Sequence, residues 1–128
     1  MGYLIVFAGA GIGGAARHGA NLAAARMFGL GFPLGTIIVN VLGSLMMGLF
    51  AGYFAYRTGI PQHLRLFLTT GILGGFTTFS TFGLDTITLV RSGDSSQAFL
   101  NILLHVVCGL AAVQFGLVAV ERFGVIAR

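Results

Sequence analysis

Two long stretches of this chain, residues 27–56 and residues 95–120, contain no charged side chain. A helix needs about 20 consecutive apolar residues to cross the hydrocarbon core of a bilayer, and both stretches exceed that length. Only 8% of all residues are charged and 56% are hydrophobic, so polar side chains are too few to cover a water-facing surface. The sequence predicts an all-α integral membrane protein, and 128 residues leave no room for a nucleotide-binding or large catalytic domain.

Charged residues and helix breakers divide the sequence into four apolar segments. Arg57 to Pro61 forms a turn, and Arg91 to Asp94 closes the third segment. Pro33 marks the start of the second segment, because proline is favoured in the first turn of a helix. We expect one domain over residues 1–128, with four transmembrane helices at residues 3–25, 33–56, 62–91 and 96–121. Four crossings place both termini on the same side of the membrane.

The seven basic residues are all arginines, and they divide almost evenly between the two predicted sides. The side of the termini holds Arg57, Arg65, Arg122 and Arg128, and the opposite side holds Arg26, Arg91 and, if it faces that way, Arg17. An excess of arginine and lysine in cytoplasmic loops sets the orientation of a membrane protein. A balance this close favours insertion both ways up, and we therefore hypothesise an antiparallel dual-topology homodimer.

Within the predicted helices, pairs of glycines four residues apart occur in three places. They are Gly9 and Gly13, Gly48 and Gly52, and Gly71 and Gly75. Residues four apart share a helix face, and small residues there let helices approach closely in lipid. The pattern predicts a tightly packed bundle and favours association of two copies.

The second apolar segment carries three polar residues on one helix face. Thr36, Asn40 and Ser44 follow the spacing i, i+4 and i+8, which aligns them along the helix. Polar side chains are costly in hydrocarbon and are therefore candidates for function. One interpretation is that they form hydrogen bonds between helices. The other is a row of hydrogen-bond donors along a narrow water-filled pore, where the two N–H groups of Asn40 suit an anion.

The third apolar segment is a poor candidate for an uninterrupted helix. Paired glycines are followed by a run rich in threonine and serine, from Thr77 to Thr81. We predict a break near Gly74 and Gly75, because broken helices occur at membrane depth where they line a cavity or bind an ion. Carbonyls turned out of such a break could ligate a cation. Phe79 and Phe82 lie three residues apart and share a face, a pattern that on its own favours core packing.

At these segments the chain strongly resembles the Fluc (CrcB) fluoride channel family. The stretches that carry the resemblance are Gly11 to Arg17, Gly35 to Ser44, and Gly71 to Phe82. The run from Thr77 to Phe82 is highly specific, and the order of the motifs agrees over nearly the whole chain, most weakly in the fourth helix. The resemblance implies a passive, fluoride-selective channel that exports fluoride across the cytoplasmic membrane and relieves its toxicity.

The resemblance also implies an assembly and a set of site residues. Members of the family are antiparallel dual-topology homodimers with two pores. Asn40, Phe79 and Phe82 would line each pore, the phenylalanines being offered by the partner subunit, and Ser80 and Thr81 would supply hydroxyls near the pore or the break. Arg17 would lie near a vestibule. A structural sodium ion at the dimer centre would be held by the main-chain carbonyls of Gly74 and Thr77 from both subunits.

The fourth helix departs from the pattern of the family, whereas Asp85 agrees with it. The fourth helix of relatives often offers Ser, Thr or Tyr along the pore, whereas this chain has His105, Cys108, Gly109 and Val113. We interpret His105 as a residue of helix packing or of an interface in preference to a gate. Asp85 falls where relatives often have a carboxylate, and a structural or capping role is favoured over proton coupling.

Three other function classes fit the sequence less well. A small dual-topology multidrug transporter has a similar size, but its proton-coupled export requires a carboxylate in the first helix, and residues 3–25 contain none. A non-conducting membrane subunit would explain the glycines but not the hydroxyl-rich break. An enzyme is disfavoured, because the sequence shows no constellation typical of nucleophilic or metal-assisted catalysis.

Overall fold

The computed structural model describes the backbone of residues 1–126 and the side chains of residues 1–123, so Arg128 lies outside the described residues. Helices make up nearly all of this part of the chain, and it contains no strand. The elements are α1 (Gly2–Phe28), α2 (Leu34–Tyr56), α3 (Gln62–Leu66), the π-helical η1 (Phe67–Leu73), α4 (Gly74–Phe76), α5 (Phe79–Arg91) and α6 (Ser95–Ile126). They form four helical segments close to the four predicted ones, with α3 to α5 as the third.

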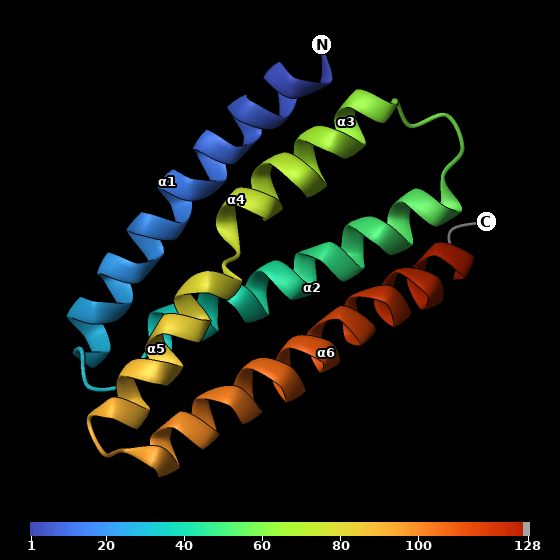
Figure 1. Ribbon diagram of the computed structural model, residues 1–128. Coiled ribbons are helices and arrows are strands. Elements are labelled where there is room, and N and C mark those ends of the chain that lie inside the picture. The colour runs from blue at the N-terminus through green and yellow to red at the C-terminus, as the bar shows by residue number, and fades with distance from the viewer. Residues whose placement is uncertain (127–128) are drawn as a thin grey trace.

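The helices run back and forth between two ends of the molecule (Figure 1). The N-terminus, the C-terminal end of α6 and the connection from α2 to α3 lie toward one end. The connections from α1 to α2 and from α5 to α6 lie at the other end. The N-terminus and the C-terminal end of α6 therefore lie toward the same end of the molecule.

Two helices are long and apolar enough to cross a membrane by length and composition, Leu34–Tyr56 and Ser95–Phe123. Only 11% of the most apolar part of the second is buried within the protein, so most of that helix presents apolar side chains to its surroundings. Exposed apolar side chains on this scale require lipid or another protein chain as their neighbour. The fold is consistent with a membrane protein.

Glycines bring the helices into backbone contact along two seams. In the first seam, a Cβ added at Gly9 would lie 2.8 Å from Gly71 Cα, and one added at Gly13 would clash with the carbonyl oxygen of Ile72. In the second seam, between α2 and α6, a Cβ at Gly48 would clash with the carbonyl oxygen of Val113. The structure confirms that these glycines pack helix against helix, as small residues do in lipid.

The break in the third segment lies at Thr77 and Thr78, a few residues beyond the predicted site. Gly74 is helical (φ −62°, ψ −36°), whereas Thr77 and Thr78 are extended (φ −81°, ψ 159° and φ −153°, ψ 115°). The glycines have a packing role, because a Cβ at Gly75 would clash with the carbonyl oxygen of Ala10 on α1. The prediction of a break was right, but its assignment to the glycine pair was wrong.

Threonine side chains stabilise both edges of this break. The Thr77 hydroxyl and the Thr77 amide both donate to the carbonyl of Leu73, each at 2.9 Å. Thr78 is the N-cap of α5, and its Oγ1 accepts a hydrogen bond from the Thr81 amide at 3.2 Å. Side-chain caps of this kind satisfy backbone groups that a helix end leaves free, so the hydroxyl-rich run sets the position of the break.

Candidate functional site

Asn40 joins α2 to the break through two hydrogen bonds. Its Nδ2 donates to the carbonyl of Thr78 at 2.9 Å, and the Thr78 amide donates to its Oδ1 at 2.7 Å. Thr78 is only 7% exposed, so both of its backbone groups would otherwise be left without a partner away from water. A primary amide has two N–H groups, and one N–H of Asn40 remains free of Thr78.

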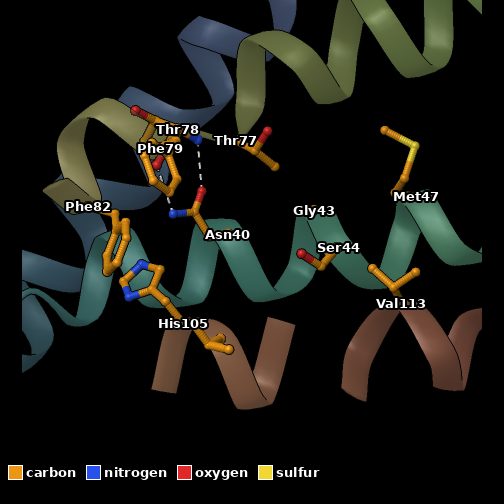
Figure 2. A pocket seen from close by; sticks show the side chains of 11 residues that line it. Asn40, Gly43, Ser44, Met47, Thr77, Thr78, Phe79, Phe82, His105 and Val113 are labelled. Atoms are coloured by element: carbon orange, nitrogen blue, oxygen red, sulfur yellow. Dashed lines mark hydrogen bonds between the residues drawn. The ribbon is translucent and has the colours of Figure 1, made fainter. Parts of the chain in front are cut away.

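Asn40 also lines a cavity of about 350 Å³ between α2, the break, α5 and α6. The residues that line it are Asn40, Gly43, Ser44, Met47, Thr77, Thr78, Phe79, Phe82, His105, Val106 and Val113. None of these eleven side chains is Asp, Glu, Lys or Arg. Figure 2 shows Asn40 with its two bonds to Thr78, the rings of Phe79, Phe82 and His105 at one end, and Met47 and Val113 at the other.

Phe79 and Phe82 form an aromatic pair at the edge of this cavity. Their ring centroids are 5.3 Å apart and their planes are inclined at 62°, so the edge of one ring meets the face of the other. Phe79 is 82% exposed in the single chain, although it is a large apolar side chain. The prediction that the two rings share a face is confirmed, and one of them lacks a full set of neighbours within its own chain.

Ser80 and Thr81 lie at the break and not in the cavity. The Thr78 hydroxyl donates to Thr81 Oγ1 at 3.0 Å and lies 3.3 Å from Ser80 Oγ. Both hydroxyls therefore belong to the cap of α5. Of the two positions that the sequence left open for them, near the pore or near the break, the geometry of the single chain supports the break.

The predicted row of Thr36, Asn40 and Ser44 is divided between two cavities. Asn40 and Ser44 line the first. Thr36 is 5% exposed and lines a second cavity of about 370 Å³, where its hydroxyl donates to Asp85 Oδ2 at 2.7 Å. Thr36 therefore does not continue the row of donors, because its one hydroxyl proton is used by the carboxylate. Asp85 has the structural partner that the sequence favoured for it.

Arg17 on α1 also forms a hydrogen bond with the break. Its Nη1 donates to the carbonyl of Thr77 at 3.2 Å. This is the same oxygen that the family resemblance assigns to a sodium ion. Gly74, the other residue so assigned, is exposed in the single chain, and the nearest atom to a Cβ built there is Thr69 O at 3.7 Å.

A second polar network, which the sequence analysis missed, links α5 to α6. Asn101 is fully buried, and its Nδ2 donates to Thr86 Oγ1 at 2.9 Å. The Thr86 hydroxyl in turn donates to the carbonyl of Phe82 at 2.8 Å. His105 Nδ1 lies 2.9 Å from the Asn101 carbonyl, and its ring lies 4.4 Å from that of Phe82. A lone asparagine in the charge-free stretch 95–120 was the available signal.

The cavity combines neutral donors with aromatic rings. The free N–H of Asn40 and the hydroxyl of Ser44 offer hydrogen to an occupant, and ring edges carry a partial positive charge. A group of three or more His, Cys, Asp or Glu that could hold a metal ion is absent from the described residues. This arrangement suits a small anion that must exchange water for hydrogen-bond donors.

The fold and the site together define a class, an all-helical membrane protein in which a broken helix borders an uncharged, donor-lined cavity. The model of one protein family, described as CrcB-like protein, Camphor Resistance (CrcB), matches residues 4–117. This chain belongs to the CrcB family.

Named relatives match nearly the whole chain. The chain is 57% identical over 121 residues to the fluoride-specific ion channel FluC of Methylobacterium nodulans. The aligned region covers 94% of this chain and 97% of the relative. It is 54% identical to the FluC of Methylobacterium sp. strain 4-46, with the same coverage. It is 49% identical to the FluC of Rhodopseudomonas palustris strain BisB5, over 94% of this chain and 98% of the relative.

Proposed function

We propose that this protein is a passive, fluoride-selective ion channel and not an enzyme. The observation that carries the proposal is the cavity around Asn40, which has no Asp, Glu, Lys or Arg in its lining, contains neutral hydrogen-bond donors, and lies where a helix is broken. The names of the relatives support the choice of ion. Export of fluoride across the cytoplasmic membrane would relieve its toxicity to the cell.

The chemistry of fluoride explains why such a lining would conduct this ion. Fluoride is small and strongly hydrated, so a narrow pore must replace its water with hydrogen-bond donors. Conduction also requires that the ion leave, and neutral donors such as the Asn40 amide hold an anion less strongly than a fixed positive charge would. The edges of Phe79 and Phe82 add weak positive electrostatics, while their bulk limits passage of larger anions.

We propose that two copies assemble as an antiparallel, dual-topology homodimer with two pores. Phe79 supports this proposal, because a phenylalanine that lines a cavity and yet is 82% exposed is incomplete without a partner. The exposure of Gly74 at the break is consistent with a partner at the same place. In the dimer, the phenylalanines of one subunit would complete the pore lined by Asn40 of the other.

A structural sodium ion at the dimer centre fits the backbone at the break. The Thr78 amide donates to Asn40 Oδ1, so the Gly74 carbonyl lacks the amide four residues on that would close a helical hydrogen bond. The Thr77 carbonyl accepts from Arg17 and keeps a second lone pair. Carbonyls of Gly74 and Thr77 from both subunits would supply neutral, hard oxygen ligands. The ion would link the subunits and would not be transported.

We place the protein in the cell inner (cytoplasmic) membrane, with four crossings and lipid around it. Two of the crossings satisfy length and composition on their own. The first segment carries Arg17, whose guanidinium is bonded to Thr77 O, and the third contains the break. Internal partners of this kind allow polar groups at membrane depth.

Fluoride efflux from liposomes that hold the purified protein tests the proposed function. We expect efflux of fluoride and retention of chloride from otherwise identical vesicles. Absence of fluoride flux, or a chloride flux of equal size, would contradict the proposal. A proton-coupled transporter would instead show flux that follows an imposed proton gradient against the fluoride gradient.

A further inference from the structure

His105 places a titratable ring inside a cavity that otherwise has no ionisable side chain. The ring lines the cavity and lies against Phe82, with centroids 4.4 Å apart and planes inclined at 39°. Nδ1 is 2.9 Å from the carbonyl oxygen of Asn101, one turn earlier on α6. Nε2 is buried, and no hydrogen-bond partner for it exists among the described residues.

The partner of Nδ1 determines what Nε2 offers. A carbonyl oxygen only accepts, so Nδ1 must carry a proton to bond with Asn101 O. In the neutral ring Nε2 then bears a lone pair, which repels an anion. In the protonated ring Nε2 carries a hydrogen and the ring carries a positive charge. One protonation step therefore converts this side of the ring from a group that rejects an anion into one that binds it.

Two contacts hold the ring, one between Nδ1 and the Asn101 carbonyl and one with the Phe82 ring. Asn101 is fully buried and bonded through its side chain to Thr86, whose hydroxyl donates to the carbonyl of Phe82. The α5–α6 network thus fixes the helix position that binds Nδ1 and the backbone of Phe82, whose ring lies against His105. Nε2 has no partner among the described residues, and an occupant of the cavity that the ring lines could supply one.

Charged groups on the surrounding elements lie outside the cavity lining. On the packed elements the charged and titratable side chains are Tyr53 and Tyr56 on α2, Asp85 and Arg91 on α5, and Cys108, Glu121 and Arg122 on α6 itself. The Asp85 carboxylate accepts from Thr36 in the second cavity, and Arg17 on α1 donates to the far side of the break. None of these side chains lines the cavity with His105.

We propose that His105 is an anion-binding residue of the pore that offers fluoride a hydrogen-bond donor only when its ring is protonated. Fluoride conduction then rises as the pH falls and the ring takes up a proton at Nε2. The proposal rests on the proposed channel function. It assigns to the fourth helix a donor that the sequence did not predict there.

Fluoride efflux at about pH 5.5 and about pH 8.5 tests the proposal. We expect the wild-type rate to be about tenfold or more lower at the alkaline value, because the neutral ring has no donor at Nε2. His105→Gln keeps a neutral amide donor at every pH, so its rates at the two pH values should agree within about twofold. His105→Phe keeps the ring against Phe82 but has no donor, and should be slow at both.

His63→Gln is the matched control, because His63 is an exposed imidazole on α3 outside the cavity. It should keep the wild-type pH dependence. The protonated form of fluoride crosses lipid unaided, so the leak of protein-free vesicles is subtracted at each pH. Elution of each variant at the wild-type volume in size-exclusion chromatography shows that it has folded.

A second measurement does not depend on conduction. With the histidine rings labelled with nitrogen-15, fluoride should shift the His105 Nε2 resonance in acid and leave it unchanged in alkali. Equal pH dependence of efflux in wild type and His105→Gln, or the same fluoride-induced shift in acid and alkali, would overturn the proposal while leaving the channel function intact. Absence of fluoride efflux at every pH would instead overturn the proposed function.

Discussion

Removal of the Asn40 amide should destabilise the protein through the break, because this side chain satisfies both backbone groups of Thr78. Asn40→Ala deletes two hydrogen bonds and leaves an N–H and a C=O unpaired at a residue that is 7% exposed. A hydrogen bond contributes about 1 kcal/mol net, and an orphaned buried group costs about 1–3 kcal/mol. We expect a loss of about 2–4 kcal/mol in the free energy of unfolding, at the lower end if cavity water reaches Thr78.

Denaturant titration in detergent micelles, followed by circular dichroism, measures this loss. Ser44→Ala is the matched control, because Ser44 lies one turn further along α2 and lines the same cavity, but its hydroxyl makes no hydrogen bond to another described residue. The control should change the free energy of unfolding by less than about 0.5 kcal/mol. A loss of less than 0.5 kcal/mol in Asn40→Ala would refute the role of this side chain in holding the break.

Asn40→Asp separates the two halves of the interaction. The carboxylate keeps an acceptor for the Thr78 amide, but it turns an oxygen toward the Thr78 carbonyl where Nδ2 donates in the wild type. It also places a negative charge in the cavity that would hold fluoride. We expect fluoride efflux to be abolished, with folding retained at reduced stability, and wild-type efflux in this variant would show that Asn40 only packs.

Three further outcomes are expected. Phe79→Ile should slow fluoride efflux about tenfold or more while the dimer survives, because Phe79 is exposed at the cavity edge; unchanged efflux would assign the ring to packing alone. Gly13→Ala should destabilise the fold, because its Cβ would clash with Ile72 O. Gly14→Ala has open space at its Cβ and should be neutral or stabilising by up to about 1 kcal/mol. Equal effects of the two variants on the free energy of unfolding would contradict the glycine seam. Replacement of sodium by a large organic cation should weaken the dimer, by about 2.7 kcal/mol if sodium stands at 100 times its Kd, and an unchanged dimer dissociation constant would argue against the central ion.

The sequence predicted the helical segments well, because charges and prolines are local signals that need no knowledge of neighbours. It placed the break at the wrong residues, because contacts between helices are not local signals. Glycine was interpreted as a source of backbone freedom, whereas Gly75 is needed for contact with Ala10 on α1, which only the packed structure reveals. The threonines that cap the break were noted as part of a hydroxyl-rich run, but not as its location.

The site was predicted less completely, because a helix face does not specify which element it meets at each turn. Thr36 and Asn40 lie one turn apart on α2, yet one faces the carboxylate of Asp85 and the other faces the backbone of Thr78. Asn101 was missed although a buried amide in an apolar helix is a strong signal. Its importance depends on Thr86, fifteen residues earlier, and no sequence spacing marks that pairing.

Asn40 and His105 would meet an anion in different ways, and the difference follows from what else each side chain must hold. Asn40 fixes the break with one N–H and its carbonyl oxygen and has one donor left, so any change that removes the donor also loosens the backbone. His105 is fixed through Nδ1 alone, which leaves Nε2 free to change its protonation without altering the helix. On this proposal, the donor of Asn40 is constant and tied to the fold, and the donor of His105 depends on pH. A change of protonation at the ring on α6 would then alter anion binding without disturbing the break, whereas a change at Asn40 would alter both.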